Sequence, residues 1–407
     1  MAELSRDEVA SWDATDPLRT FREEFELPEG VVYLDGNSLG ALPKKTPERL
    51  REIVGSEWGR DLIRSWNAHD WIRYPRRVGD RIASIVGARP GEVVAADSTS
   101  VNLFKLLGAA LRLRPDRPLI LSERENFPTD LYVAQGLSEL LGRVELKLVP
   151  REELLGALDE RVAVLSLTHV DFRTGAMHDM AEITRRAHEN GALALWDLSH
   201  SAGALPLFLD RDGVDLAVGC GYKYLNGGPG APAFLYVAER HQESLRPPLS
   251  GWMGHEAPFA FDTDYRPAPG IERHLCGTPS ILAMAALEVG VEIFSRVDMT
   301  VVREKSMRLG KLFLDLVGPA LEPACPEDAE KRGSQVSLQH PEGYAIMQAL
   351  IAEGVIGDFR APDILRFGFT PLYLRYVDVW DAVAVLKRIL ENETYRQPEF
   401  RKRQLVT

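Results

Sequence analysis

The stretch Gly219-Cys220-Gly221-Tyr222-Lys223-Tyr224-Leu225-Asn226-Gly227-Gly228-Pro229-Gly230 decides the fold that we predict for this sequence. It places Lys223 directly after a predicted strand at residues 216–220, among small residues that would let a planar group approach the backbone. A lysine in such a setting is desolvated and can form an imine. A lone loop lysine, however, is more often simply exposed. The glycines do not fit the GxGxxG pattern, because Tyr224 stands where the third glycine is required.

A carboxylate precedes this lysine at the end of another predicted strand. Residues 192–196 are apolar and lead into Asp197, and a buried carboxylate needs a cationic partner or several donors. A protonated pyridine nitrogen is such a partner. Taken alone, Asp197 is equally well explained as the cap of the following turn. The separation between Asp197 and Lys223 nevertheless matches that between the ring-binding carboxylate and the imine-forming lysine of pyridoxal phosphate enzymes.

Two weaker signals lie further upstream. Thr99 and Ser100 stand at a predicted helix start, where backbone N–H groups and hydroxyls can bind a phosphate. Phe127 follows a predicted strand at 118–122 and could stack on a cofactor ring. Each feature alone is more often an ordinary helix cap or turn. In open α/β sheets, ligands bind beyond the carboxyl ends of the strands. The four signals in this order therefore predict a fold-type I enzyme that carries pyridoxal phosphate on Lys223.

The wider pattern predicts an α/β fold. Short apolar strands alternate with amphipathic helices at 130–141 and 179–189, which indicates a mostly parallel sheet of the seven-stranded type covered by helices on both faces. The strands of this sheet are expected at 118–122, 144–149, 162–167, 192–196, 216–220 and 233–237. We expect an N-terminal segment at 1–83, containing a short strand at 31–34, a large cofactor-binding domain at 84–278, and a smaller α+β C-terminal domain at 279–407. That last domain should contain helices at 281–294, 301–317, 344–353 and 377–391 and strands at 335–339 and 364–369.

With these residues placed, the sequence resembles the kynureninase family from about Tyr33 to Tyr373. The segments that carry the resemblance are Leu34-Asp35-Gly36-Asn37-Ser38-Leu39-Gly40, Phe127-Pro128-Thr129-Asp130, Trp196-Asp197-Leu198-Ser199-His200-Ser201-Ala202-Gly203, the lysine stretch quoted above, Gly251-Trp252, Gly277-Thr278-Pro279, Arg366 and Pro371-Leu372-Tyr373. The lysine segment and the Trp-Asp-Leu-Ser-His segment are specific, whereas the Thr-Ser pair is not.

The resemblance implies a set of roles. It implies hydrolytic cleavage of the Cβ–Cγ bond of L-kynurenine, or of its 3-hydroxy form, to give anthranilate and L-alanine. Lys223, Tyr222 and Asp197 would be catalytic, with Tyr222 moving a proton at the γ-oxygen and also reaching the phosphate. Further cofactor contacts would come from Thr99, Ser100, Phe127, Asp130, Thr168 and His200, and from Trp252 and Thr278 of a neighbouring subunit.

The resemblance extends to the substrate and the assembly. Arg366 would clamp the substrate α-carboxylate, for which its planar fork is well shaped, and Trp66 and Asn37 would also contact the substrate. Ser65-Trp66-Asn67 and Gly277-Thr278 look like the bacterial type, which prefers kynurenine over 3-hydroxykynurenine. An active site shared between subunits implies a homodimer.

Two other functions remain open at this point. A cysteine desulfurase of the same fold needs a mobile nucleophilic cysteine, and Cys325 lies at a suitable distance after the lysine. Its setting, Pro323-Ala324-Cys325-Pro326, is unlike such a loop. A non-enzymatic protein of this fold would usually lack the lysine or its aspartate, and both are present.

Composition excludes several further classes. The net charge is −12, so a nucleic-acid partner is not expected, and we expect the one basic run, Arg401-Lys402-Arg403, to be a solvated tail. No uncharged apolar run approaches the roughly 20 residues of a membrane helix, and the N-terminus has no apolar signal segment. Cys220, Cys276 and Cys325 are too dispersed for a disulfide framework or a metal site. We therefore expect a cytoplasmic protein without a metal ion.

Overall fold

The centre of the protein is a sheet of seven strands in the order β4-β10-β9-β8-β7-β5-β6. The computed structural model describes residues 4–404. Outside the described part lie residues 1–3 of the predicted N-terminal segment and residues 405–407 of the predicted C-terminal domain. The strands are β4 (Val93–Ala95), β5 (Leu119–Glu123), β6 (Glu145–Val149), β7 (Val162–Thr168), β8 (Leu193–Asp197), β9 (Leu216–Gly219) and β10 (Phe234–Val237).

The sheet is mostly parallel, as predicted. Pairs from β6 to β9 run parallel, whereas β10 is antiparallel to both β9 and β4. Every residue of β7 and β8 is buried, which explains why these strands are continuously apolar rather than alternating. The six predicted strands are confirmed to within one residue at each end. The seventh, β4, is only three residues long and joins the edge of the sheet.

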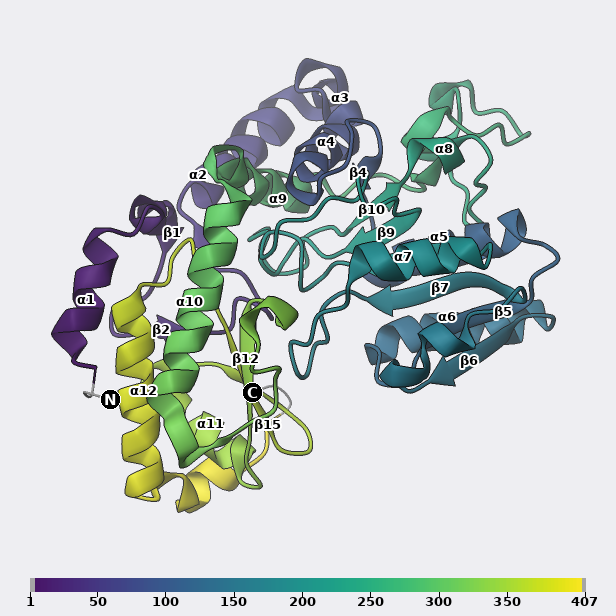
Figure 1. The fold of residues 1–407 in the computed structure, drawn as a ribbon. Coiled ribbons are helices and arrows are strands. Elements are labelled where there is room, and N and C mark those ends of the chain that lie inside the picture. Colours follow the sequence, from purple (N-terminus) through teal and green to yellow (C-terminus); the bar gives the residue numbers. More distant parts are fainter. Residues whose placement is uncertain (1–3, 405–407) are drawn as a thin grey trace.

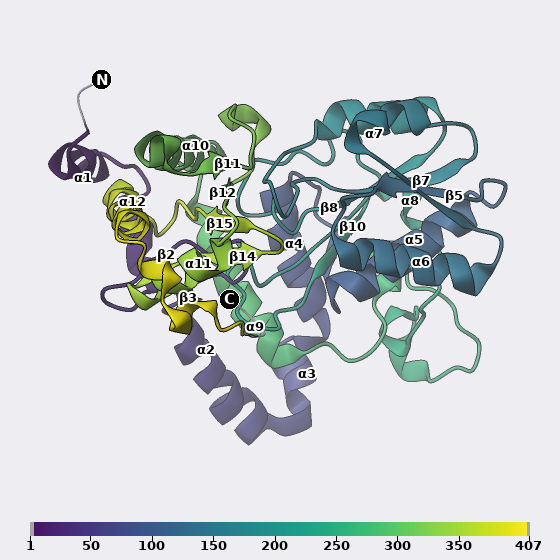
Figure 2. The ribbon, with the colours of Figure 1, turned by 90° about the horizontal axis from the view of Figure 1, so that it is seen from below.

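Helices cover both faces of this sheet (Figures 1 and 2). Helix α7 (Met180–Glu189) begins at Asp179, whose side chain accepts a hydrogen bond from the Glu182 N–H, and is followed by Gly191 with a positive φ of 73°. The other helices that cover the two faces of the sheet are α4 (Tyr74–Val86), α5 (Thr99–Leu113), α6 (Pro128–Leu141) and α9 (Ile281–Ile293). Helix α4 packs against both β4 and α9, so the residues before and after the sheet meet at its edge.

A smaller lobe is built around a second sheet, with strand order β11-β12-β15-β14. Its strands are β11 (Glu322–Pro323), β12 (Gln335–Gln339), β14 (Asp358–Arg360) and β15 (Ile364–Gly368), and all neighbours are antiparallel. Its helices are α10 (Met299–Val317), α11 (Gly343–Ala352) and α12 (Tyr376–Glu391). The N-terminal helix α1 (Arg6–Ala14) packs on α12, far from the large sheet (Figure 1).

The N-terminal chain joins the two sheets. The predicted strand at 31–34 is β2 (Val32–Tyr33), which pairs in parallel with β13 (Val355–Ile356) of the smaller lobe. The following residue Asp35 forms an isolated bridge with Gly368 at the end of β15. Helix α2 (Thr46–Glu52) then continues as a wider π-helical stretch over Ile53–Asp61 before the chain enters α4. The segment 35–40 therefore lies beside β15.

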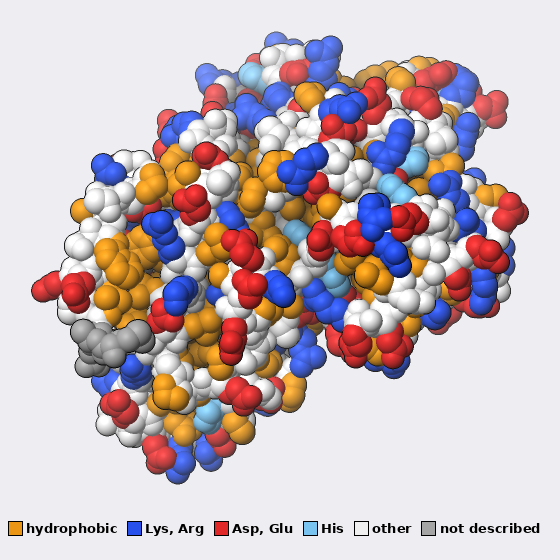
Figure 3. All heavy atoms as spheres, in the orientation of Figure 1, with side chains coloured by type: hydrophobic (Ala, Val, Ile, Leu, Met, Phe, Trp, Pro, Cys, Tyr) orange, Lys and Arg blue, Asp and Glu red, His pale blue; other side chains and the backbone are white. Residues whose placement is uncertain are grey.

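The surface agrees with the mixed composition of the chain. On the face shown in Figure 3, acidic and basic side chains are interspersed rather than gathered into a basic stripe. The C-terminal basic run is exposed, as expected, but it is not free, because the Arg403 guanidinium lies 5.5 Å from the centre of the Tyr344 ring. Between residues 4 and 404, no helix is both long and apolar enough to cross a membrane.

Candidate active site

Lys223 lies in the loop after β9, with its amine beside His200. The Nζ of Lys223 is 2.9 Å from Nε2 of His200, and Nδ1 of His200 is buried without a hydrogen-bond partner. Burial, and next the nearby charge of Lys223, lower the pKa of His200 well below its ordinary value. His200 is therefore neutral, and its Nε2 can accept a hydrogen bond from the lysine.

Asp197 ends β8 and lies near Asp130 of α6. Burial raises the pKa of both carboxyl groups, and the charge of Asp197 raises that of Asp130 further. The larger rise falls on Asp130, which favours its protonated form. Asp197 also accepts a hydrogen bond of 2.7 Å from the Ser199 N–H, and the Thr168 hydroxyl oxygen lies 3.3 Å from Oδ2 of Asp130. Two buried carboxyl groups with raised pKa values thus lie close together at the carboxyl edge of the sheet.

Phe127 stands over the same site from the start of α6. Its ring centre lies 6.0 Å from the Lys223 amine, and 37% of its surface is exposed. Asn126, beside it, accepts hydrogen bonds from the Phe127 N–H and the Thr168 hydroxyl through one oxygen. On the far side, Phe172 meets Phe127 edge-on at 5.2 Å. Phe127 is therefore held by these contacts while part of its surface stays exposed.

Thr99 and Ser100 occupy the first turn of α5, as predicted. The N-cap is Ser98, whose hydroxyl accepts a hydrogen bond from the Val101 N–H at 3.4 Å, so Thr99 and Ser100 are not used for capping. Both of these residues are partly exposed. The helix is fifteen residues long. Its exposed N–H groups and these two hydroxyls form a suitable phosphate site.

The glycines of the lysine loop serve a different purpose from the one predicted. A Cβ at Gly221 would lie 2.3 Å from the Pro232 carbonyl, and one at Gly227 would lie 2.8 Å from Leu287 of α9. These glycines are required for close packing inside the protein. The prediction that they admit a cofactor is therefore wrong for these two positions, although the lysine loop itself lies where expected.

Arg366, in β15, is almost fully buried and already paired. Its Nε donates to Oδ1 of Asp358 at 2.6 Å, its Nη2 donates to Asp358 and, at 3.1 Å, to Ser38, and its Nη1 donates to the Phe172 carbonyl. Sequence reasoning missed Asp358, because the pairing depends on the register that sets Asp358 opposite Arg366 across β14 and β15. The hydrogen bonds of Arg366 use four of the five guanidinium N–H groups and leave one on Nη1.

The segment 35–40 connects Arg366 to the lysine loop. Gly40 donates its N–H to the Tyr222 carbonyl at 2.8 Å, and a Cβ there would lie 2.3 Å from the Lys223 carbonyl. At the other end, Asn37 is fully buried, and its side chain lies against Gly368, where a Cβ would meet it at 1.9 Å. Asn37 thus fixes the smaller lobe against the lysine loop.

The remaining predicted residues lie on outer segments. Trp66, in α3 (Ser65–Ala68), packs edge-on against Trp71 at 6.1 Å. Trp252 packs in the same way against Phe259 at 5.6 Å, and Thr278 is exposed. Within residues 4–404, no hydrogen bond or aromatic contact joins Trp66, Trp252 or Thr278 to Lys223. Tyr222 is half-buried, and burial raises the pKa of its hydroxyl, which is therefore protonated.

The site fits a planar, phosphorylated pyridine aldehyde. Asp197 at the end of β8, with Asp130 of α6 near it, suits a protonated ring nitrogen, which would offset the burial of Asp197, and the partly exposed ring of Phe127 suits stacking on the cofactor ring. The start of α5 suits the phosphate, and Lys223 supplies the amine. Asp130 Oδ1 and His200 Nδ1 are buried polar atoms that still lack partners.

Comparison with known proteins gives the family. A family model described as the kynureninase C-terminal domain matches residues 302–386. Over 99% of its length the chain is 53% identical to the whole of a kynureninase from Burkholderia pseudomallei (strain 1106a). The chain belongs to the kynureninase family. A kynureninase from Pseudomonas fluorescens is 50% identical over the same share of this chain and over all of its own length.

Solved structures show the fold of this kynureninase-family chain. An apo cysteine desulfurase from Thermococcus onnurineus NA1 superposes with a TM-score of 0.77 at 20% identity, covering 96% of this chain and 100% of its own. A cystine C-S lyase, C-DES, in complex with its product cysteine persulfide, superposes with a TM-score of 0.71 at 19% identity, covering 89% and 98%. The fold is fold type I, as predicted from the four strand-end signals.

Proposed function

We propose that this protein is a kynureninase, which hydrolyses the Cβ–Cγ bond of L-kynurenine to give anthranilate and L-alanine. The observation that carries this proposal is that about half of the residues of this chain are identical to those of kynureninases along its full length. The grouping of Lys223, Asp197 and Arg366 around one site supports it. The enzyme is a hydrolase of carbon–carbon bonds in ketonic substrates. Pyridoxal phosphate is its cofactor and, when bound, supplies an electron sink for charge developing on the substrate.

One group of residues would bind the cofactor or move a proton at the substrate Cα. Lys223 would hold the cofactor covalently and then, once freed, remove and return a proton at the substrate Cα. Asp197, with a protonated Asp130 near it, would keep the ring nitrogen protonated. Phe127 would cover one face of the ring, and Thr99 and Ser100 would bind the phosphate.

Other residues would act on the substrate side. The protonated hydroxyl of Tyr222 would move a proton at the oxygen of the γ-carbonyl, while water would add to the carbon of that carbonyl before the Cβ–Cγ bond breaks. His200, being neutral, would accept a hydrogen bond from Lys223 and orient the amine without competing for its proton. Arg366 would bind the α-carboxylate, and Asn37 and Trp66 would line the substrate site. Trp66 and the Gly277-Thr278 pair support a preference for kynurenine over 3-hydroxykynurenine, and comparable turnover of both substrates would contradict it.

We propose that the enzyme works as a homodimer, with Trp252 and Thr278 reaching the cofactor phosphate of the other subunit. Large apolar side chains are exposed on two outer segments, which supports this arrangement, since such patches usually mark contact surfaces. They are Trp58, Leu62, Ile63, Phe259 and Phe261. Sedimentation of a single species of twice the chain mass would agree, and a monomer with full activity would not.

A cytoplasmic location, and the division into residues 1–83, 84–278 and 279–407, stay proposals. The free thiols Cys220, Cys276 and Cys325 suit a reducing compartment. Cys325 lies at the margin of the core of the smaller lobe, which does not favour a role as a mobile nucleophile.

One experiment tests the activity directly. Purified protein loaded with pyridoxal phosphate is mixed with L-kynurenine, anthranilate is followed by fluorescence, and alanine is quantified at the end. Equimolar anthranilate and alanine are expected. Release of sulfide from free cysteine without cleavage of kynurenine would instead favour a desulfurase.

A further inference from the structure

Four charged side chains form a cluster around the guanidinium of Arg366: Asp35, Asp358, Arg360 and Arg366 itself. Asp358 pairs with two nitrogens of Arg366, and its Oδ2 lies 2.8 Å from Nη2 of Arg360. Asp35 is brought beside them because its backbone bridges to Gly368, two residues after Arg366. The Oδ1 of Asp35 is enclosed and has no hydrogen-bond partner in the described chain.

The net charge of this cluster depends on Asp35 alone. Two arginines and two ionised aspartates sum to zero, whereas protonation of Asp35 leaves one positive charge. Asp358 cannot provide this change: burial would raise its pKa, but the hydrogen bonds and charge of Arg366 outweigh burial and lower it. Burial, and next the charge of Asp358, raise the pKa of Asp35 to about 7.

The other groups around Asp35 do not titrate in the same range. Burial raises the pKa of each neighbouring phenol above its ordinary value, so all of them stay neutral; they are Tyr33, Tyr224 and Tyr373. Burial and the charges of Lys223 and Arg366 lower the pKa of His200, which is already neutral. Ser38, between Asp358 and Arg366, carries no charge. Near neutral pH, Asp35 is thus the group that sets the charge a substrate carboxylate meets.

We propose that Asp35 is a positioning residue that binds its proton as the substrate α-carboxylate binds, and that its ionisation weakens the hold of Arg366 on that carboxylate. The inference rests on the proposed function, because it takes Arg366 as the group that binds the α-carboxylate. A new negative charge beside Arg366 favours the neutral form of Asp35, and by linkage the loss of that proton reduces carboxylate affinity by the same factor. Affinity for carboxylate ligands therefore falls as pH rises through the pKa of Asp35.

The test measures binding rather than turnover. The holoenzyme is titrated calorimetrically with L-alanine and with L-alaninamide, which has the same amine but no carboxylate, from about pH 6 to about pH 9. Wild type is compared with Asp35→Asn, which is neutral at every pH, and with Asp381→Asn, a matched change on the surface of α12. The ligand amine titrates in the same way with both proteins. Its effect therefore cancels in the ratio of the wild-type dissociation constant to that of Asp35→Asn.

For L-alanine this ratio should rise about tenfold across that range, whereas for L-alaninamide it should stay constant. Asp381→Asn should follow wild type with both ligands. A constant ratio for L-alanine, or the same rise with both ligands, would overturn the inference. Asp35→Ser, also neutral, replaces Asp35→Asn if that variant does not fold. Cleavage of L-kynurenine by the same wild-type preparation is measured separately, so failure of the proposed activity is seen independently of the binding result.

Discussion

The Nζ of Lys223 lies 2.9 Å from Nε2 of His200, and the other ring nitrogen of His200 is buried without a partner. The imidazole is therefore neutral where it touches the lysine and acts as an acceptor. We expect His200→Gln, which keeps a neutral acceptor, to retain turnover within about tenfold of wild type, with the acidic limb of kcat/KM unchanged. Loss of that limb in the variant would show that His200 titrates in the working range.

Lys223→Ala should abolish steady turnover. Without the amine, no residue at this position can move the Cα proton, so kcat for anthranilate release should fall by more than about 10³-fold. Some cofactor should remain bound, held at the start of α5 and by Asp197. Borohydride treatment followed by mass spectrometry should attach cofactor to wild type and to the exposed-lysine control Lys311→Ala, but not to Lys223→Ala. Normal turnover by Lys223→Ala would contradict the assignment.

Tyr222→Phe should separate kcat from KM. Burial raises the pKa of the Tyr222 hydroxyl, so it is protonated and can donate at the γ-oxygen. Its removal should lower kcat by about 10²-fold and change KM little, because this proton moves only in the chemical step. Steady-state rates with L-kynurenine decide the point, and full turnover would exclude this role.

Arg366→Ala should reduce both binding and stability. It removes the main cationic partner of buried Asp358 and leaves it with Arg360 and Ser38, so it should cost up to about 3–5 kcal/mol of unfolding free energy. Arg366→Met combined with Asp358→Leu replaces the pair by apolar groups and should recover most of the stability but not the KM. Chemical denaturation and KM for L-kynurenine measured on both variants distinguish the two effects. Equal stability of Arg366→Ala and wild type would mean that Asp358 is solvated or protonated there.

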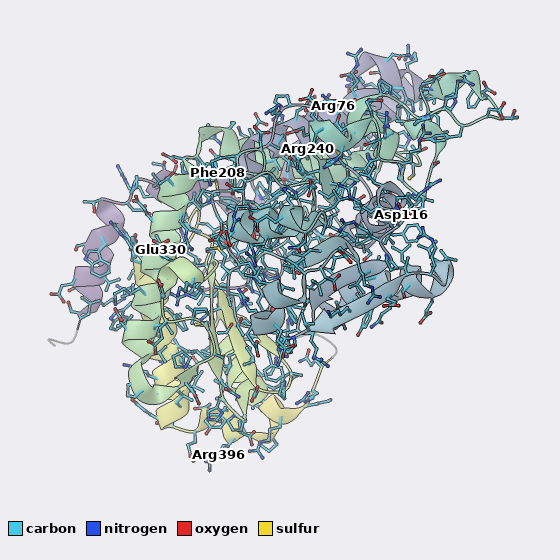
Figure 4. All side chains as sticks on the ribbon, turned by 45° about the vertical axis from the view of Figure 1, so that its right-hand side comes forward. Arg76, Asp116, Phe208, Arg240, Glu330 and Arg396 are labelled. Atoms are coloured by element: carbon cyan, nitrogen blue, oxygen red, sulfur yellow. The ribbon has the colours of Figure 1, made fainter. Side chains whose placement is uncertain are left out.

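Asp215 should make stability depend on pH. Burial alone would raise its pKa, but hydrogen bonds from His188 and His241, each 2.7 Å long, outweigh burial and lower the pKa. Arg240, labelled in Figure 4, donates a further bond of 2.7 Å. A carboxyl group whose pKa is lowered in the folded protein stabilises the fold at pH values above its pKa in the unfolded chain, which is about 4. This stabilisation is lost as the pH falls below that value toward the pKa of the folded protein. Asp215→Asn should therefore unfold at a lower temperature than wild type at neutral pH, with the difference shrinking in acid. A constant difference would contradict this.

The sequence was informative wherever function depends on the position of a residue along its own strand. Asp197, Thr168 and Lys223 could each be placed at a strand end, because long buried strands have a distinct apolar pattern, and parallel strands bring these ends together. The short strand β4 carries too few residues for such a pattern, and the π-helical stretch at Ile53–Asp61 does not differ in composition from an ordinary helix.

Relationships between distant segments could not be predicted. The pairing of Arg366 with Asp358 depends on the register of β14 and β15, and the approach of Asp35 depends on its bridge to Gly368. No local propensity encodes either contact. The same reason explains the glycines of the lysine loop: Gly221 and Gly227 are small because Pro232 and Leu287 lie against them, which a sequence alone does not reveal.

The parallel pairing of β2 with β13 has a consequence for how the chain folds during synthesis. Val32 and Tyr33 leave the ribosome 323 residues before their partners Val355 and Ile356. Because closure of so long a loop is slow, the large sheet can form while β2 is still without its partner strand. The enzyme therefore acquires its substrate site only after the C-terminal strands emerge, and a ribosome stalled before β13 should hold a nascent chain that has the large sheet but cannot dock segment 35–40.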